Sequence, residues 1–440
     1  MSVSRPSIAH PAWCYPRREG RVGVTEAVYC LRAPSPYNSA RMKDASEASA
    51  SRCLEHVRHL SERIGPRGST TAQEREAASY AGSVLERLGL DVAVQRFRSA
   101  VSAWRPYALA LALALLALAI YPIGSRVTAV IAAVIMITVF VSAFLELNFT
   151  PNPLRWVLPK GWSQNVWAVI PPRGQPRRKV VLVGHLDTHR TPFVFRSARH
   201  LKIFALLSPL GFGGMLTLFA LFVVGAIVQA EWVHVAAVFV GLGLAVLLMI
   251  LVQADFTPYA HGANDNASGA AVVLALAERL ARQPLAGSEV WALNTGCEEV
   301  GCYGADAFLR EHRAQLQDAY FVVFDSVGGP GAGPCFITRE GMTRRYYPDP
   351  RLLSLARSLA AARPELGAYE MPMRLGYTEG AIGIKRGLRT ITFVSLGRKD
   401  GILPLWHQVH DRVDKIDADT LARTEEFAWE MLQRIDAGEV

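Results

Sequence analysis

Four long apolar runs interrupt a chain that otherwise alternates short apolar stretches with polar loops. Each run has about 18 to 26 residues without Asp, Glu, Lys or Arg, enough for a helix to cross a hydrocarbon core of roughly 30 Å. Short polar turns join the runs in pairs. The runs span residues 107–124, 127–145, 203–228 and 232–252. We expect two transmembrane hairpins, at residues 104–148 and 203–252, rather than buried helices of a soluble core.

Outside these runs, strand-like and helix-like segments alternate along the chain. Strands are predicted at residues 163–170, 179–186, 288–295, 319–326 and 389–396, with a further one at DVAVQRF. Helices are predicted at residues 51–64, 71–88, 267–282, 302–314, 350–362 and 418–436. This alternation is typical of an α/β fold with a mainly parallel, mixed sheet sandwiched by helices.

One domain is expected to contain all of these segments, although the hairpins split it. It comprises residues 51–98, 149–202 and 253–440. Residues 1–50 mix Pro, Arg, Ser and Ala without periodicity and lack the apolar core of a secretory signal, which predicts a disordered segment. Because the first convincing helix follows Met42, that residue is an alternative translation start to Met1.

Composition agrees with a membrane protein. The chain is 51% hydrophobic and only 19% charged, and its mean hydropathy is +0.18, which is more apolar than a soluble enzyme usually is. The formal net charge of +9 indicates an anionic partner. We find no basic helix interleaved with aromatic residues, so the sequence disfavours nucleic acid and favours an anionic membrane surface.

The cysteines do not follow the spacing of a disulfide framework. They are Cys14, Cys30, Cys53, Cys297, Cys302 and Cys335. A chain of this length does not need disulfides to fold, so free or buried thiols are expected. A bridge between Cys297 and Cys302 remains an alternative.

Histidines and carboxylates recur at the ends of predicted strands and the starts of predicted helices. They are His185 and Asp187 in GHLDT, Asp265 in GANDNASG, Glu298 and Glu299 in GCEEVG, Asp325 in VVFDS, and His407 in HQVHDRVDKID. In α/β sheets such loop residues converge on one crevice beyond the carboxyl ends of the strands. Zinc accepts imidazole and carboxylate ligands, and two ions about 3.5–4 Å apart need a bridging ligand. The pattern therefore predicts a metal site.

If the candidate residues form one metal site, both hairpins must leave them on the same side of the membrane. His185 lies between the two pairs of runs, and the other candidate residues follow the second pair, so each pair must cross the bilayer and return. Basic residues gather on the domain side of the runs: Arg96, Arg98, Arg105, Arg155, Lys160, Arg196, Arg199 and Lys202. The opposite turns carry only Arg126 as a basic residue. The positive-inside rule then predicts a multi-pass protein of the bacterial inner membrane with its folded domain in the cytoplasm.

On these motifs, residues 51–98 and 163–436 resemble the M28 (clan MH) zinc aminopeptidases. The family pattern GHxDt, gaNDNaSG, EE, D and HxxxDxxDkiD is matched by GHLDT, GANDNASG, EE, FDS and HQVHDRVDKID. The resemblance implies a zinc-exopeptidase-like fold, two zinc ions per chain and peptide substrates.

The resemblance also implies a role for each candidate residue. Asp265 would bridge the two ions, and His185 and Asp325 would complete the shell of one of them. Glu299 and His407 would complete the shell of the other. Glu298 would act as the general base. Asp187 would not bind an ion itself but would orient the His185 ring.

Two histidines compete for the last ligand position. Reading HQVHDRVDKID as HxxxDxxDkiD places His407, Asp411, Asp414 and Asp417 on the family pattern without a gap. Choosing His410 loses part of that match, so His407 is favoured.

Two features depart from the family. The hairpins lengthen connections that are short in compact members, which a sheet tolerates when the ends of an insertion lie close together. Thr378 and Glu379 stand where the family often has Ser-Asp, which puts the substrate contacts around Tyr377 in doubt.

The expected function is a membrane-anchored zinc aminopeptidase. One alternative is a one-zinc, glutaminyl-cyclase-like aminoacyl transferase, and another is a non-catalytic membrane scaffold or receptor. The sequence does not indicate the side-chain preference, the native substrate or the oligomeric state.

Overall fold

An eight-stranded mixed sheet organises the folded part of the chain in a computed structural model that describes residues 49–121 and 125–440. These residues lie in one compact unit, Lys43–Val440. The predicted disordered segment and Met42 lie outside the described residues, except that residues 49 and 50 are already helical.

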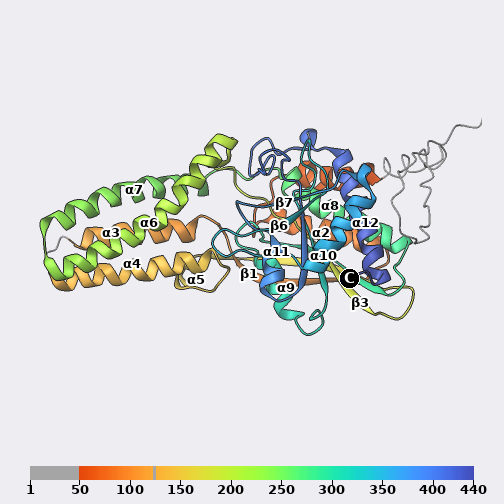
Figure 1. Cartoon of the computed structure of the whole chain (residues 1–440), viewed down its shortest axis with the longest axis horizontal. Helices are drawn as coiled ribbons and strands as arrows, with labels where there is room; N and C mark the ends of the chain where they lie inside the picture. Colours follow the sequence, from red (N-terminus) through yellow and green to blue (C-terminus); the bar gives the residue numbers. More distant parts are fainter. Residues whose placement is uncertain (1–48, 122–124) are drawn as a thin grey trace, which may run out of the picture. The chain divides into compact units, whose positions relative to one another are not determined.

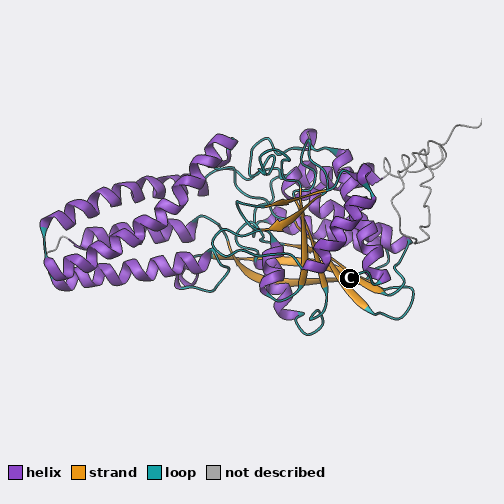
Figure 2. Cartoon of the chain, in the orientation of Figure 1, coloured by secondary structure: helices purple, strands orange, loops and turns teal. Residues whose placement is uncertain are grey.

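The strand order is β1-β2-β4-β3-β5-β8-β6-β7, and the strands gather at the centre of the helical layers (Figure 2). The strands are β1 (Val92–Ala100), β2 (Lys160–Ile170), β3 (Arg178–His185), β4 (Ser288–Thr295), β5 (Tyr320–Asp325), β6 (Cys335–Arg339), β7 (Tyr369–Pro372) and β8 (Arg389–Val394). The central strands β4, β3, β5 and β8 pair in parallel, whereas β1, β2 and β6 add antiparallel pairings. The predicted mixed α/β sheet is confirmed.

Alternating side chains of the central strands supply two separate cores, because successive residues of a strand point to opposite faces. In β3, Val180 and Leu182 join one core with the helices α2 (Ala72–Arg87), α8 (Gly269–Arg282), α10 (Pro350–Ala362) and α12 (Ala418–Ala437). Val181 and Val183 join the other core with α9 (Tyr303–Glu311) and α11 (Glu379–Lys385). Burial on both faces explains why these strands read as continuous apolar runs.

The short strands β6 and β7 were not predicted from the sequence. They have 5 and 4 residues, and neither shows a clear alternation of apolar and polar positions. Their pairing depends on contact with distant segments, β6 with β8 and β7 with β6. Such pairing leaves little trace in a local pattern.

The four apolar runs form long helices that pack on one another (Figure 1). They are α3 (Arg105–Ile120), α4 (Arg126–Glu146), α6 (Ala198–Val228) and α7 (Glu231–Asp255). α3 and α6 each pack against both α4 and α7. The interior of this bundle is rich in small residues such as Ala114, Ala117 and Ala132, which are fully buried and let the helices approach closely.

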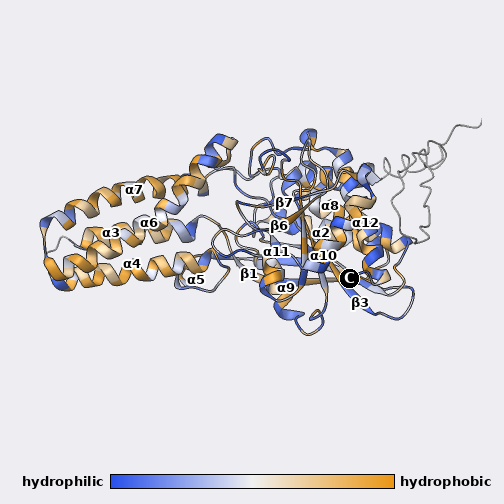
Figure 3. Cartoon of the chain, in the orientation of Figure 1, coloured by the Kyte–Doolittle hydropathy of each residue, from blue (hydrophilic) through white to orange (hydrophobic). Residues whose placement is uncertain are grey.

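The outer surface of the bundle remains apolar, as Figure 3 shows by colour. Leu206, Ile227 and Phe239 are 70%, 69% and 71% exposed. A water-soluble surface rarely presents such a continuous apolar area. Three of the helices, α4, α6 and α7, are long and apolar enough to cross a membrane. α3 is apolar but has only 16 residues, so the fourth predicted span stays a prediction.

A charge on the outer face of α7 is expected to impair membrane insertion. Leu242 is 59% exposed near the middle of this helix, and Val94 on β1 is 60% exposed. Arg at the centre of a membrane-spanning helix costs roughly 2.5–3.5 kcal/mol of insertion free energy. We expect Leu242→Arg to reduce the protein recovered in membranes after carbonate extraction, whereas Val94→Arg has no effect. Equal recovery of the two variants would show that water, not lipid, surrounds α7.

Candidate metal centre

The candidate residues lie where central strands end. His185 and Asp325 are the last residues of β3 and β5, and Glu298 and Glu299 follow β4 after a short turn. Asp265 lies in the irregular turn Ala263–Ser268 that leads into α8. The parallel strands β4, β3 and β5 bring these loops to the same edge of the sheet.

Asp265 lies between two histidines. Its Oδ1 atom is 3.6 Å from Nε2 of His185, and its Oδ2 atom is 3.3 Å from Nε2 of His407. Around His185, Asp325 Oδ1 lies 3.9 Å from the same nitrogen. Around His407, Glu299 Oε2 lies 3.1 Å from Nε2. The two oxygens of one carboxylate therefore face two separate groups of ligand atoms.

The structure brings His407, and not His410, to this cluster. The side chain of His407 is 10% exposed and contacts two of the carboxylates. His410 lies three residues further along the same loop and is exposed. This placement agrees with the motif alignment that favoured His407.

Several buried polar atoms at the cluster have no hydrogen-bond partner, which is costly unless another group satisfies them. They are Nε2 of His185, Oε1 of Glu299 and Nδ1 of His407. Imidazole nitrogens and carboxylate oxygens are the donor types that zinc accepts. The residues present therefore fit divalent metal ions.

Asp187 holds two parts of the cluster in place. Its carboxylate accepts hydrogen bonds from the backbone N–H groups of Glu298 at 3.0 Å and Glu299 at 3.2 Å. It also accepts a bond from the Ser69 hydroxyl at 2.6 Å and lies 3.5 Å from Nδ1 of His185. Although burial raises the pKa of Asp187, these neighbours lower it overall. Asp187 thus orients both His185 and the turn that carries the two glutamates.

Asp411 holds the backbone at Asp265 in place. This role was not predicted from the sequence. The Asp411 carboxylate accepts hydrogen bonds from the backbone N–H groups of Asn264 at 2.7 Å and Asp265 at 3.0 Å. Burial raises the pKa of Asp411 to about 7. Asp411 lies at a matched position of the family pattern in HQVHDRVDKID, and this match could have indicated that it belongs to the site.

Glu298 keeps one carboxylate oxygen unengaged. Its Oε1 atom accepts a hydrogen bond from the Cys302 thiol at 3.3 Å, and its Oε2 atom lies 3.9 Å from Nε2 of His185. Burial raises the pKa of Glu298 well above its ordinary value, and Glu299 and Asp325 raise it further, although His185 lowers it. Such a carboxylate can accept and hold a proton.

The cysteines near the cluster are not bridged. Cys297 and Cys302 are both free and buried. The Cys297 backbone N–H donates a hydrogen bond to the buried Glu74 carboxylate at 2.9 Å. The expectation of free thiols at these two positions is confirmed, and the alternative bridge between them is wrong.

Thr378 and Glu379, which depart from the family's Ser-Asp, begin α11 beside the cluster. The Thr378 hydroxyl donates to the buried Glu340 carboxylate at 2.9 Å. Glu379 is 1% exposed, and neither of its carboxylate oxygens has a hydrogen-bond partner. Burial raises the pKa of Glu379 to about 7. The exchange therefore keeps a buried acid at this position.

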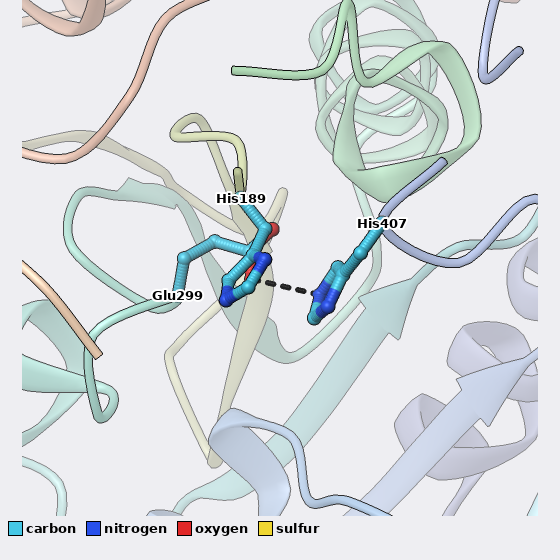
Figure 4. Close-up of side chains that lie close together, drawn as sticks. All are labelled: His189, Glu299 and His407. Carbon is cyan, nitrogen blue, oxygen red and sulfur yellow. Dashed lines mark ion pairs between the residues drawn. The ribbon is translucent and has the colours of Figure 1, made fainter. Parts of the chain in front are cut away.

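His189 is a further residue of the cluster that the sequence analysis missed. It forms a group with Glu299 and His407 whose possible ligand atoms lie within 4.8 Å of one another (Figure 4). The spacing of His185, Asp187 and His189 could have indicated this position, because alternate residues of an extended segment point to the same side.

Comparisons with known proteins agree with the fold. Residues 248–432 match the model of Peptidase family M28, which confirms the predicted resemblance over that region. No curated protein matches the chain.

Similar solved structures include both peptidases and cyclases. An aminopeptidase from Aneurinibacillus sp. strain AM-1 is 14% identical, with a TM-score of 0.52 and coverage of 88% of this chain and 93% of that one. BSAP, a zinc aminopeptidase from Bacillus subtilis, is 16% identical, with a TM-score of 0.51 and coverage of 87% and 95%. Bacteroides thetaiotaomicron glutaminyl cyclase is 16% identical, with a TM-score of 0.51 and coverage of 87% and 97%. At these identities the likeness establishes a common fold.

The two competing histidines can be separated by metal binding. We expect His407→Ala to weaken zinc binding by at least the 10- to 100-fold that loss of an outer-shell partner costs. His410→Ala, three residues away and exposed, is the matched control and should bind zinc like the wild type. Competition with a chromogenic chelator measures both affinities. Weaker binding in His410→Ala alone would reverse the assignment.

Proposed function

We propose that this chain, whose residues 248–432 match the M28 peptidase family, is a membrane-anchored zinc peptidase that removes N-terminal residues from peptides. The observation that carries this proposal is the position of Asp265 between His185 and His407, at 3.6 Å and 3.3 Å. A carboxylate placed in this way suits a pair of ions.

In the proposed centre, two zinc ions would be held by His185 and Asp325 on one side and by Glu299 and His407 on the other, with Asp265 contributing to both groups of ligands. Asp187 fixes the direction of His185, because its backbone carbonyl oxygen lies 3.2 Å and its carboxylate 3.5 Å from Nδ1, the ring nitrogen that faces away from the centre. When bound, the ions polarise the scissile carbonyl and lower the pKa of a water molecule.

Glu298 performs the proton transfers of the proposed reaction. Its Oε2 atom takes the proton of the attacking water, since Oε1 is engaged by the Cys302 thiol. The protonated carboxyl group then delivers this proton to the leaving amine.

The proposed setting is the bacterial inner membrane, with the peptidase domain in the cytoplasm. α4, α6 and α7 support membrane anchoring by their length and apolar composition. The basic residues on the domain side of the helices support the orientation. The proposed partners are the lipid bilayer and a peptide, and not nucleic acid.

A one-zinc aminoacyl transferase is the second candidate, because glutaminyl cyclases share the fold. The pairing of Glu299 with His407 at 3.1 Å supports two ions instead. Zinc content per chain separates the two candidates. A non-catalytic scaffold or receptor is disfavoured, because all the expected ligand residues are present.

Replacing the proposed base tests the reaction. Glu298→Gln removes the proton acceptor but keeps the size of the side chain, so turnover of aminoacyl-arylamides should fall on the order of 10²- to 10⁴-fold. Zinc content should stay at the wild-type value. Glu86→Gln, on the exposed side of α2, is the matched control and should leave both unchanged. Near-wild-type turnover of Glu298→Gln would refute the role, and a wild type that cleaves none of the arylamides would refute the proposed aminopeptidase.

A further inference from the structure

We propose that three aromatic rings, those of His189, Phe195 and Trp406, position the His407 ring for metal binding. We call these three residues the ring clamp. They are positioning residues and not ligands, and none of them lies in the matched family motifs. This inference rests on the metal centre of the proposed function, but not on the reaction that the centre performs.

The two histidines of the centre are held in different ways. Nδ1 of His185 lies 3.2 Å from the backbone carbonyl oxygen of Asp187 and 3.5 Å from its carboxylate, which is the usual way to orient a metal-binding histidine. His407 turns Nε2 toward Asp265 and Glu299. Its buried Nδ1 has no hydrogen-bond partner within residues 49–121 and 125–440. The direction of the His407 ring therefore depends on packing.

His189 covers one face of the His407 ring. The two imidazoles stack with centroids 3.7 Å apart and planes inclined by 14°, and Figure 4 shows them beside Glu299. Nitrogen lone pairs lie in the plane of an imidazole, so those of two stacked rings are nearly parallel. His189 thus offers His407 a flat face and does not aim at the same ion. A flat neighbour in contact hinders rotation of the ring out of its plane.

Phe195 and Trp406 restrict the same ring further. The Phe195 ring lies 4.5 Å from that of His407 at an angle of 59°, and the Trp406 ring lies 5.0 Å from it at 45°. Phe195 also meets Trp406 edge-on at 5.0 Å and His189 edge-on at 5.9 Å. Edge-to-face pairs are favourable arrangements of aromatic rings. The members of the ring clamp therefore support one another as well as His407.

The backbone of His407 needs such support. Its φ is +52°, in the left-handed region that residues other than glycine seldom adopt. A conformation of this kind persists where the surrounding contacts fix it. His189 can provide a fixed contact, because its backbone carbonyl accepts a hydrogen bond from the Ala260 N–H at 2.9 Å. Trp104 meets the other end of this contact, edge-on to the His189 ring at 5.5 Å.

The consequence is that the two groups of ligands have separate supports. Asp187 supports the His185 side, and the ring clamp supports the His407 side. Phe195 ends the short helix η3 (Phe193–Phe195), just before α6 begins, so the support of His407 comes partly from the helical bundle. Loss of a ring from the clamp should weaken the binding of one ion and spare the other.

The test is a zinc titration of the detergent-purified, metal-stripped full chain by calorimetry. For His189→Ala, which removes the stacked ring, we expect at least about 10-fold weaker affinity at the binding step that His407→Ala also weakens, and no change at the other step. His189→Phe restores a flat ring without nitrogen and should bind zinc like the wild type at both steps. Phe195→Leu keeps an apolar side chain without the ring and should weaken the same step as His189→Ala, which carries the test if His189→Ala does not fold.

The matched control is His59→Ala, because His59 stacks on Tyr80 at the same distance of 3.7 Å. It should titrate like the wild type. Wild-type affinity in both His189→Ala and Phe195→Leu would overturn the inference, as would equal losses at both steps or a loss in His189→Phe as large as that in His189→Ala. A wild type that binds zinc in two steps but cleaves no arylamide defeats the proposed aminopeptidase alone, whereas a wild type that takes up no zinc defeats both proposals.

Discussion

Mutual repulsion among buried carboxylates is the constraint on which the candidate site depends. Asp265, Glu299 and Asp325 are each less than 10% exposed and lie around the same two histidines. Among the described residues, Arg67 is the one Arg or Lys that is fully buried. Its guanidinium donates to backbone carbonyls, including that of Gly262 at 2.8 Å. Because buried charges are stable only when they are paired or bind metals, the cluster requires added positive charge. The divalent cations proposed for this site would supply it at the place where the ligand atoms converge.

The fold keeps these repelling groups together by hydrogen-bonding their backbones. Asp187 accepts the N–H groups of the turn that carries Glu298 and Glu299, and Asp411 accepts those of Asn264 and Asp265. Asn266 joins the same turn to β5, since its amide donates to the carbonyl of Phe324 at 2.9 Å. The site is therefore rigid at the level of the main chain, although it lies on loops.

The central strands could be predicted because they are buried on both faces, and so their sequences are continuous apolar runs. The convergence of His185, Glu299 and Asp325 followed from the same sheet, because parallel strands place their carboxyl ends together. His407 and Asp411 lie in a long loop after β8, so they could be placed only by a sequence motif and not by periodicity. His189 was not predicted because its contact with the cluster is a ring stacked on His407, which lies far along the chain. β6 and β7 were not predicted because they are defined by pairing with segments far away in the sequence.

The aromatic side chains at the base of the helical bundle reach the candidate site. Phe195 lies 4.5 Å from the His407 ring and 5.0 Å from Trp406, and Trp104 packs in the same apolar cluster as the helices. The helical bundle and the candidate metal site thus share aromatic side chains. A version of the protein trimmed of its helices would lose part of the aromatic lining of the candidate site, and His407 would face solvent where it now faces Phe195.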